Sequence, residues 1–379
     1  METIQREKLT GQVKISQQEL QSSTASMQGV KDVRSALESL DQKDVSAFLS
    51  SLLLGAYLLE ASDLHAETEK GHVKVRLRID GLLQDLQTLT PSWYSSLLSR
   101  IKLVSGVKLN VSDRPQDGRF SLVFEGRDPI EVRVSSLPSE YGESLVLRLL
   151  DPTRLVKIKG LGLREDLEEL FLREIKKPNG MIVVTGPTGS GKTTTLYAFL
   201  QEVQDPELKI ITIEDPIEYH LEGINQTQVN PQKGYDFASG LRAIVRQDPD
   251  VILVGEVRDS QTAEIALQAA LTGHLVFSTI HTNDAAGTIS RFSALGSKQD
   301  TISSALSLII AQRLVRKVCQ ACASLRKATP EETKKIRQAV GSLKIAKPSS
   351  FKIAEPKGCK TCNGTGYKGR VGIFEAIVV

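Results

Sequence analysis

The stretch MIVVTGPTGSGKTTTLYAFL, residues 181–200, joins an apolar run to a helical pattern through a glycine-rich turn. Glycines in such a turn let successive backbone N–H groups point at phosphate oxygens, and the start of the next helix adds its dipole. The sequence therefore predicts a nucleotide-binding loop formed by Gly186, Pro187, Thr188, Gly189, Ser190, Gly191, Lys192, Thr193 and Thr194.

Two side chains of this loop have expected roles. Lys192 would reach the β- and γ-phosphates of ATP, and Thr193 would hold Mg²⁺. The alternative is a chance match in a glycine-rich turn. Against it, the apolar run before the loop and the helical pattern after it are the flanking elements that a phosphate-binding loop needs.

Two further apolar runs have the character of strands. IITIED (210–215) and VILVGE (251–256) both end in carboxylates, and helical segments separate them. Such runs indicate an α/β domain whose mostly parallel sheet is buried on both faces. Because the carboxyl ends of parallel strands meet at one edge, Glu214, Asp215 and Glu256 are candidates for the chemistry. Glu218 and Asp259 are more typical of solvated loop carboxylates.

Two histidines bracket another strand-like run, TGHLVFSTIHTND (272–284). A lone histidine is usually structural. Here His274 and His281 flank a strand of an ATP-binding domain and Thr282 follows, so a contact to the γ-phosphate and a structural role both stay open.

The first half of the chain has a different pattern. HVKVRLRIDGLLQDL (72–86) and FSLVFEGRDPIEVRVSSLP (120–138) alternate with a period of two, and turn formers lie at Asp80–Gly81 and at residues 125–127. This predicts a small sheet with a helix or two beside it. The apolar stretch 45–59 is too short to span a membrane and predicts a buried amphipathic helix.

These patterns divide the 379 residues into regions, as the length also suggests. We expect a flexible or helical segment over 1–44, an α+β domain over 45–150, a linker over 151–163 and an ATPase domain over 164–379. The totals of 48 basic and 45 acidic residues give no electrostatic footprint for nucleic acid. The first residues lack the apolar core of a signal peptide, so we expect a cytoplasmic protein.

The four cysteines form two CxxC pairs, with 36 residues between the pairs and a charged helix predicted at 329–340. Four thiolates in two such pairs suit tetrahedral Zn²⁺ in a structural site. A redox pair and unbound thiols are the alternatives. The predicted ligands of this insert, 319–362, are Cys319, Cys322, Cys359 and Cys362.

Taken together, the motifs resemble the secretion ATPase superfamily that powers type II secretion and type IV pili. LRAIVRQDPDVILVGEVRD (241–259) is similar to its Walker B region, ITIEDPIEY to its Asp box and TGHLVFSTIHTND to its His box. The resemblance implies a RecA-like P-loop ATPase domain preceded by a small α+β, PAS-like domain. It further implies that Glu214 positions the attacking water, that Glu256 acts at Mg²⁺ and that His281 senses the γ-phosphate.

The resemblance extends over the first half. ASDLHAETEKGHVKVRLRIDGLL (61–83) is similar to a family segment, although Ala66 and Thr68 depart from it. Arginines of this domain reach nucleotide in family members, some from a neighbouring subunit, and Arg133 and Arg148 fall at the matching positions. The alternative is that both are ordinary exposed strand residues. The family's extra N-terminal domain and helical tail have no counterpart in this sequence, which suggests a trimmed chain.

The function implied by the resemblance is that of a homohexameric motor. It would use ATP, Mg²⁺ and Zn²⁺ to assemble type IV pili or type II pseudopili. It would lie in the cytoplasm, peripheral to the inner membrane, and bind a platform protein and a cytoplasmic-ring component, with no nucleic acid. By the same resemblance, assembly ATPases of the family commonly carry the tetracysteine insert, whereas retraction motors resemble the same core without it. The alternatives are a retraction ATPase, a RecA-like DNA translocase and a non-hydrolysing scaffold.

Overall fold

A computed structural model describes residues 11–41, 44–340 and 350–379. By its internal contacts the chain forms two units. We call residues up to Leu150 together with Arg316–Gly369 the N-terminal unit, and Asp151–Val315 together with Arg370–Val379 the P-loop unit. The cysteine-containing segment is thus grouped with the N-terminal unit, and β13 and β16 each cross the boundary between the units.

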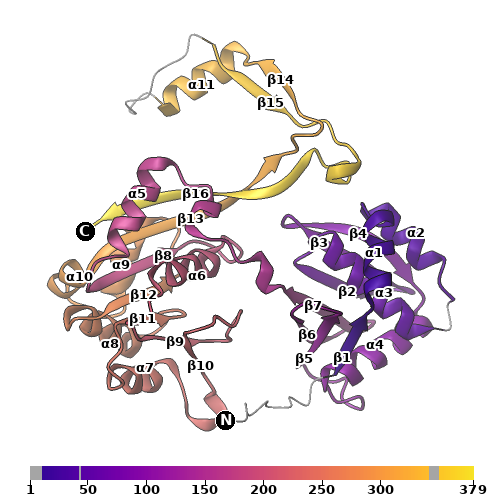
Figure 1. The fold of residues 1–379 in the computed structure, drawn as a ribbon, viewed down its shortest axis with the longest axis horizontal. Helices are drawn as coiled ribbons and strands as arrows, with labels where there is room; N and C mark the ends of the chain where they lie inside the picture. Colours follow the sequence, from indigo (N-terminus) through magenta and orange to yellow (C-terminus); the bar gives the residue numbers. More distant parts are fainter. Residues whose placement is uncertain (1–10, 42–43, 341–349) are drawn as a thin grey trace. The chain divides into compact units, whose positions relative to one another are not determined.

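The P-loop unit is built on a sheet of seven strands in the order β10-β9-β11-β12-β8-β13-β16 (Figure 1). The pairs from β10 to β13 are parallel. The strands are β8 (Gly180–Thr185), β9 (Ile210–Glu214), β10 (Asn225–Gln228), β11 (Val251–Val254), β12 (Leu275–Ile280), β13 (Leu306–Val318) and β16 (Tyr367–Val378). The helices are α5 (Glu165–Glu174), α6 (Lys192–Val203), α7 (Phe237–Val245), α8 (Ser260–Leu271), α9 (Ala285–Ala294) and α10 (Gln299–Ala305), with short 3₁₀ turns at Pro152–Arg154, Ile158–Leu161 and Pro231–Lys233.

Helices cover both faces of this sheet. Met181 and Val183 of β8 pack into one apolar cluster with residues of α7, α8, α9 and α10. Ile182 and Val184 alternate with them and pack into a second cluster with residues of α5 and α6. Because successive side chains of a strand point to opposite faces, the continuous apolar runs are explained by burial on both sides. The α/β class with a mostly parallel sheet is confirmed.

The N-terminal unit is an α+β arrangement on a second sheet of seven strands, in the order β1-β5-β6-β7-β2-β3-β4. Its strands are β1 (Gln12–Ile15), β2 (Asp63–Glu69), β3 (His72–Ile79), β4 (Leu82–Leu89), β5 (Gln116–Phe124), β6 (Ile130–Ser139) and β7 (Gly142–Leu150). The helices that accompany this sheet in residues 11–150 are α1 (Gln17–Ser26), α2 (Val30–Glu38), α3 (Val45–Leu58) and α4 (Pro91–Ser105). The sheet is therefore larger than the small one that we expected, whereas the two helices α3 and α4 within 45–150 agree with the expectation of a helix or two.

The period of two is confirmed in β3, where every second residue is buried. The turn after it is also as expected, because Asp80 and Gly81 both have positive φ, 50° and 85°. Two successive residues of that kind make the short hairpin turn that fits the twist of paired strands. The likeness of this unit to PAS domains remains a prediction.

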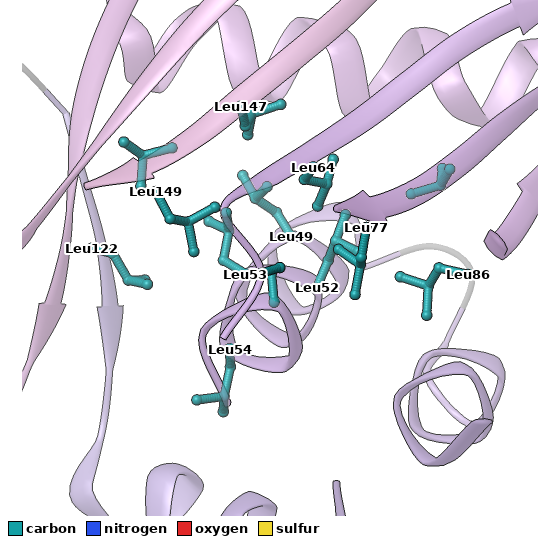
Figure 2. Close-up of a cluster of buried hydrophobic side chains, with 14 of the residues drawn as sticks. Leu49, Leu52, Leu53, Leu54, Leu64, Leu77, Leu86, Leu122, Leu147 and Leu149 are labelled. Atoms are coloured by element: carbon teal, nitrogen blue, oxygen red, sulfur yellow. The ribbon is translucent and has the colours of Figure 1, made fainter. Parts of the chain in front are cut away.

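The core of the N-terminal unit lies between α3 and the sheet (Figure 2). Leu49, Leu52 and Leu53 of α3 are at most 1% exposed and lie beside buried leucines of the strands, including Leu64 and Leu77. The stretch 45–59 is thus a buried helix, as predicted. None of the described helices has both the length and the hydropathy that crossing a bilayer requires.

The start of the chain differs from the simplest expectation for 1–44. Residues 1–10 lie outside the described part, but β1 pairs in parallel with β5, and Val13 and Ile15 are buried. The helix α1 begins with a capping box between Ser16 and Glu19. Helices were anticipated in this segment, whereas the strand was not, because four residues carry too little periodicity to identify one.

Candidate active site and metal centre

The glycine-rich loop connects β8 to α6, as the sequence predicts. Gly186 has φ 138°, and a Cβ built on it would stand 2.3 Å from the backbone oxygen of Gln312, so no larger residue fits there. Gly191, with φ 90°, is the N-cap of α6. These two glycines hold the turn that aims backbone N–H groups and the start of the helix at one point.

Two polar side chains of the loop fit a phosphate ligand. Lys192 Nζ donates to the backbone oxygens of Gly186 and Pro187, at 2.9 and 3.2 Å. Burial lowers the pKa of Lys192, and the nearby Glu256 carboxylate partly offsets this. Ser190 is 3% exposed, and within the described part of the chain its Oγ has no hydrogen-bond partner. Among the described residues no carboxylate is hydrogen-bonded to Lys192, so a buried donor and a cation are both present for an anionic ligand.

A glutamine of the neighbouring strand fixes the helix behind the loop. Thr195 Oγ1 of α6 donates to Gln312 Oε1 of β13 at 2.7 Å, and the two residues are 0% and 3% exposed. Sequence reasoning missed this pair, which joins positions 117 residues apart.

Three predicted residues follow adjacent parallel strands. Glu214 ends β9, Glu256 follows β11 and His281 follows β12, so all three lie at the carboxyl edge of the sheet, where the loop after β8 also lies. Glu256 is contacted on both oxygens, by Arg258 Nη2 at 2.6 Å and by His281 Nε2 at 3.5 Å. Arg258 was not predicted, although it stands in the quoted Walker B stretch.

Glu214 is 3% exposed. Burial raises its pKa, and hydrogen bonds from Thr212, Tyr197 and Gln226 oppose the rise. The burial of Glu214 therefore agrees with the prediction that it is more than a solvated loop carboxylate. By contrast, Asp259 caps α8 by accepting from the Thr262 N–H at 2.8 Å, a structural role.

The structure separates the two histidines. His274 precedes β12, at the sheet edge opposite to the loop, and its Nδ1 lies 3.0 Å from the backbone oxygen of Ala269. The position of His274 therefore argues against a contact with the γ-phosphate. Of the two histidines, only His281 remains a candidate for that contact. Chain direction could have shown this, because the residue before a parallel strand and the residue after it lie at opposite edges.

The two candidate arginines belong to the N-terminal unit. Arg133 of β6 and Arg148 of β7 are direct cross-strand partners. Arg133 Nε contacts Glu131 at 3.2 Å, and Arg148 Nε contacts the buried Asp63 at 2.9 Å. The Arg148 side chain is 55% exposed and that of Arg133 is 22% exposed. Neighbouring carboxylates thus orient both guanidinium groups.

The four cysteines come together, and their sulfur atoms all lie within 4.8 Å of one another. The Sγ–Sγ distances are 4.0 Å for Cys319–Cys359, 3.9 Å for Cys322–Cys362 and 3.8 Å for Cys359–Cys362. Zn–S bonds of about 2.3 Å in a tetrahedron separate the sulfurs by about 3.8 Å. The donor set therefore fits Zn²⁺.

Backbone groups support this cluster. The N–H groups of Cys359 and Gly366 donate to Cys362 Sγ at 3.1 and 3.2 Å. Burial alone would raise the pKa of the Cys362 thiol, but these donors, together with the side chains of Cys359 and Cys322, outweigh it and lower the pKa to about 6. The segment between the pairs holds β14 (Ser324–Lys327), β15 (Lys352–Glu355) and α11 (Pro330–Val340), which confirms the predicted helix. A 3₁₀ turn, Lys360–Cys362, ends in Asn363, whose Oδ1 accepts from the Val30 N–H at 3.1 Å.

Fold and site together define a P-loop ATPase with a tetracysteine cluster. The family model described as Type II/IV secretion system protein matches residues 38–379, so the chain belongs to that family. Type II secretion system protein E of Aeromonas hydrophila is 46% identical over 344 residues, which are 90% of this chain and 67% of that protein. Type IV pilus assembly ATPase PilB of Thermus thermophilus is 43% identical over 374 residues, 98% of this chain and 41% of that protein. The chain thus spans part of these relatives.

Solved structures give the same fold. The pilus retraction motor PilT with bound ADP is 36% identical, with a TM-score of 0.55 over 71% of this chain and 79% of that one. The Legionella pneumophila ATPase DotB is 24% identical, with a TM-score of 0.61 over 88% of this chain and 80% of that one, which shows likeness of fold alone.

Proposed function

We propose that this chain is the motor ATPase of a type II secretion or type IV pilus machine of the assembly kind. The observation that carries the proposal is the meeting of Lys192, Glu214, Glu256 and His281 at one edge of a parallel sheet. The relatives named for type II secretion and for pilus assembly, which align with 90% and 98% of the chain, support the biological setting.

In this proposal each residue of the edge has one role in hydrolysis. Lys192 exchanges its two backbone acceptors for oxygens of the β- and γ-phosphates. Thr193 would hold Mg²⁺ and Glu256 would act at it, and the ion would neutralise charge on the phosphates. Glu214 orients the attacking water. The water oxygen bonds to the γ-phosphorus, the bond to the bridging oxygen breaks, and ADP leaves while the water's proton passes by way of Glu214 to solvent. His281 contacts the γ-phosphate.

The assembly direction rests on the cysteine cluster. The tetracysteine insert is the feature that the family resemblance associates with assembly ATPases, and the sulfur geometry supports Zn²⁺ in it. The zinc would be structural, because four thiolates leave no open position for substrate. Retraction is the second candidate, favoured by the 36% identity to PilT, which covers 71% of the chain.

The proposal includes a homohexamer that lies in the cytoplasm, peripheral to the inner membrane, and binds a platform protein and a cytoplasmic-ring component. Arg133 and Arg148 would then contribute to the nucleotide site of a neighbouring subunit. The carboxylates that hold both guanidinium groups in place support such a positioned role.

The first test is ATP turnover by the purified chain, measured as phosphate release. Lys192→Ala should abolish turnover and weaken nucleotide binding, because the positive charge at the phosphates is lost. Lys176→Ala, at an exposed lysine of the same unit, is the matched control and should leave both unchanged. Turnover by the Lys192→Ala protein at the control's rate would refute the assignment of the loop.

The second test separates assembly from retraction. Deleting the gene in the bacterium that carries this chain should remove surface filaments or stop secretion. Filaments that persist and accumulate in the deletion strain would instead identify a retraction motor.

A further inference from the structure

Glu214 is held by a buried network that its catalytic role alone does not explain. Within the described part of the chain three side chains donate to the carboxylate. Thr212 Oγ1 and Gln226 Nε2 donate to Oε1 at 2.6 and 3.2 Å, and Tyr197 donates its hydroxyl hydrogen to Oε2. A carboxylate has about four acceptor positions, so one position is left, and it is on Oε2.

The donor on Oε2 comes from the helix that begins at the phosphate-binding loop. Tyr197 belongs to the second turn of α6, is 0% exposed, and packs edge to face against Tyr219 with ring centroids 6.1 Å apart. Its position is thus fixed by the same helix that carries Lys192. A displacement of α6 relative to β9 would be transmitted directly to one oxygen of Glu214.

The donors on Oε1 are equally constrained. Gln226 Oε1 accepts from the Leu221 N–H at 2.8 Å, and Gln226 Nε2 also donates to the Tyr219 backbone oxygen at 2.9 Å. The reversed amide would place its NH₂ group against the Leu221 N–H, so the network selects the orientation that donates to Glu214. Gln226 lies on β10, directly beside Thr212 of β9. Oε1 is therefore saturated by a rigid pair of strands.

We propose that Tyr197 is a positioning residue that orients Glu214 so that the remaining acceptor position on Oε2 receives the attacking water. Thr212 and Gln226 support this role, because their hydrogen bonds occupy both acceptor positions of Oε1 and leave only Oε2 for the water. The inference rests on the proposed role of Glu214 in hydrolysis and adds which oxygen acts and what holds it.

The ionisation of the site is consistent with this arrangement. Burial raises the pKa of Glu214, the three donors lower it, and the charge of Glu218 raises it again. Burial, then the Glu214 charge, raise the pKa of Tyr197, so its hydroxyl keeps the proton it donates. Glu218 and Tyr197 are thus ionisable groups that bear on Glu214. A donor to the charged form favours the carboxylate, so removing the Tyr197 hydroxyl raises the pKa of Glu214 further.

The test compares Tyr197→Phe with Tyr235→Phe. The Tyr235 hydroxyl lies 3.0 Å from Thr227 Oγ1 on β10 and is not among the described donors to Glu214, so it controls for the loss of a partly buried tyrosine hydrogen bond in the same region. Tyr197→Phe should lower kcat about tenfold or more, as expected for one hydrogen bond to a charged group, with ATP affinity unchanged. The acid limb of the kcat–pH profile should move up by about one unit, which corresponds to that tenfold change.

The outcomes distinguish this inference from the proposal beneath it. If Glu214→Gln is inactive and Tyr197→Phe shows the shifted acid limb while Tyr235→Phe does not, the positioning role holds. If Glu214→Gln is inactive but the Tyr197→Phe profile matches that of Tyr235→Phe, the positioning role is wrong and the catalytic role stands. Turnover by Glu214→Gln would overturn the catalytic assignment itself.

A second variant keeps the test decisive if Tyr197→Phe does not fold. Thr212→Val keeps the shape of the side chain and removes one donor from Oε1. It should move the acid limb in the same direction, because that donor also favours the carboxylate. An unshifted limb in a folded Thr212→Val protein would contradict the network.

Discussion

His281 Nε2 lies 3.5 Å from Glu256 Oε2, and this contact joins the ends of two neighbouring strands. Parallel pairing of β11 with β12 places both residues at the edge that carries the phosphate-binding loop. Arg258 contacts the other oxygen of Glu256. Two partners thus orient Glu256. Its negative charge also raises the pKa of Lys192 and so partly offsets the lowering of that pKa by burial.

Glu256→Gln should lower ATP turnover by on the order of 10²-fold or more while nucleotide remains bound. The amide keeps the shape of the side chain, and the loss falls on the metal and the transition state, whereas the loop and Lys192 still hold the phosphates. Phosphate release gives the rate and calorimetry gives the affinity. The control is Glu264→Gln, at an exposed position of α8. Near-normal turnover in the Glu256→Gln protein would remove Glu256 from the mechanism.

The parts predicted correctly from sequence are those in which a short pattern has one physical solution. The loop at 186–193 needs glycines and a helix start, and the runs 210–215 and 251–256 begin with short, mostly apolar stretches that suit a strand buried on both faces. The four cysteines are similar, because their chemistry and spacing suit one metal geometry.

The missed features are pairings between distant positions. The parallel pairing of β1 with β5 and the hydrogen bond from Tyr197 to Glu214 depend on how the sheets are ordered, and local periodicity carries no information about strand order. Tyr197 looks like an ordinary core residue in the helical pattern of α6. Its hydroxyl acquires a role only when β9 is placed beside that helix.

Thr195 and Gln312 offer a test of how α6 is fixed. Thr195→Val leaves the Gln312 amide oxygen buried without this donor. Gln312→Met leaves the Thr195 hydroxyl buried without this acceptor. Each should lower the free energy of unfolding by about 1–3 kcal/mol, and the double variant should cost less than the sum. Urea unfolding measures all three, with Gln268→Met at an exposed site of α8 as the control. Additive costs would show that the bond contributes nothing.

Arg133 and Arg148 should act across subunits. Arg133→Ala and Arg148→Ala should each reduce turnover without preventing ATP binding, and arginine fingers in other P-loop enzymes contribute on the order of 10³-fold or more. Mixing Arg133→Ala subunits with Lys192→Ala subunits is the decisive measurement. At some interfaces each subunit supplies what the other lacks, so partial recovery of activity indicates a shared site.

The control for that experiment is a mixture in which no recovery is possible. Lys192→Ala subunits mixed with Glu256→Gln subunits lack two groups that we place in the same chain's site, so activity should stay low. If the Arg133→Ala mixture is equally inactive, the arginine acts within its own subunit or not at all.

The metal prediction follows from the sulfur cluster. The purified protein should contain close to one Zn²⁺ per chain by elemental analysis, and Cys359→Ser should lose it, whereas Lys360→Ser in the same turn should keep it. Zinc contributes roughly 10–16 kcal/mol in small thiolate domains, so residues 319–362 should become protease-sensitive without it. The phosphate-binding loop belongs to the other unit, so ATP binding should persist.

A zinc-free protein with an intact, protease-resistant insert would contradict the structural role of the zinc. Loss of ATP binding in the zinc-free protein would show that the cysteine cluster and the nucleotide site are coupled.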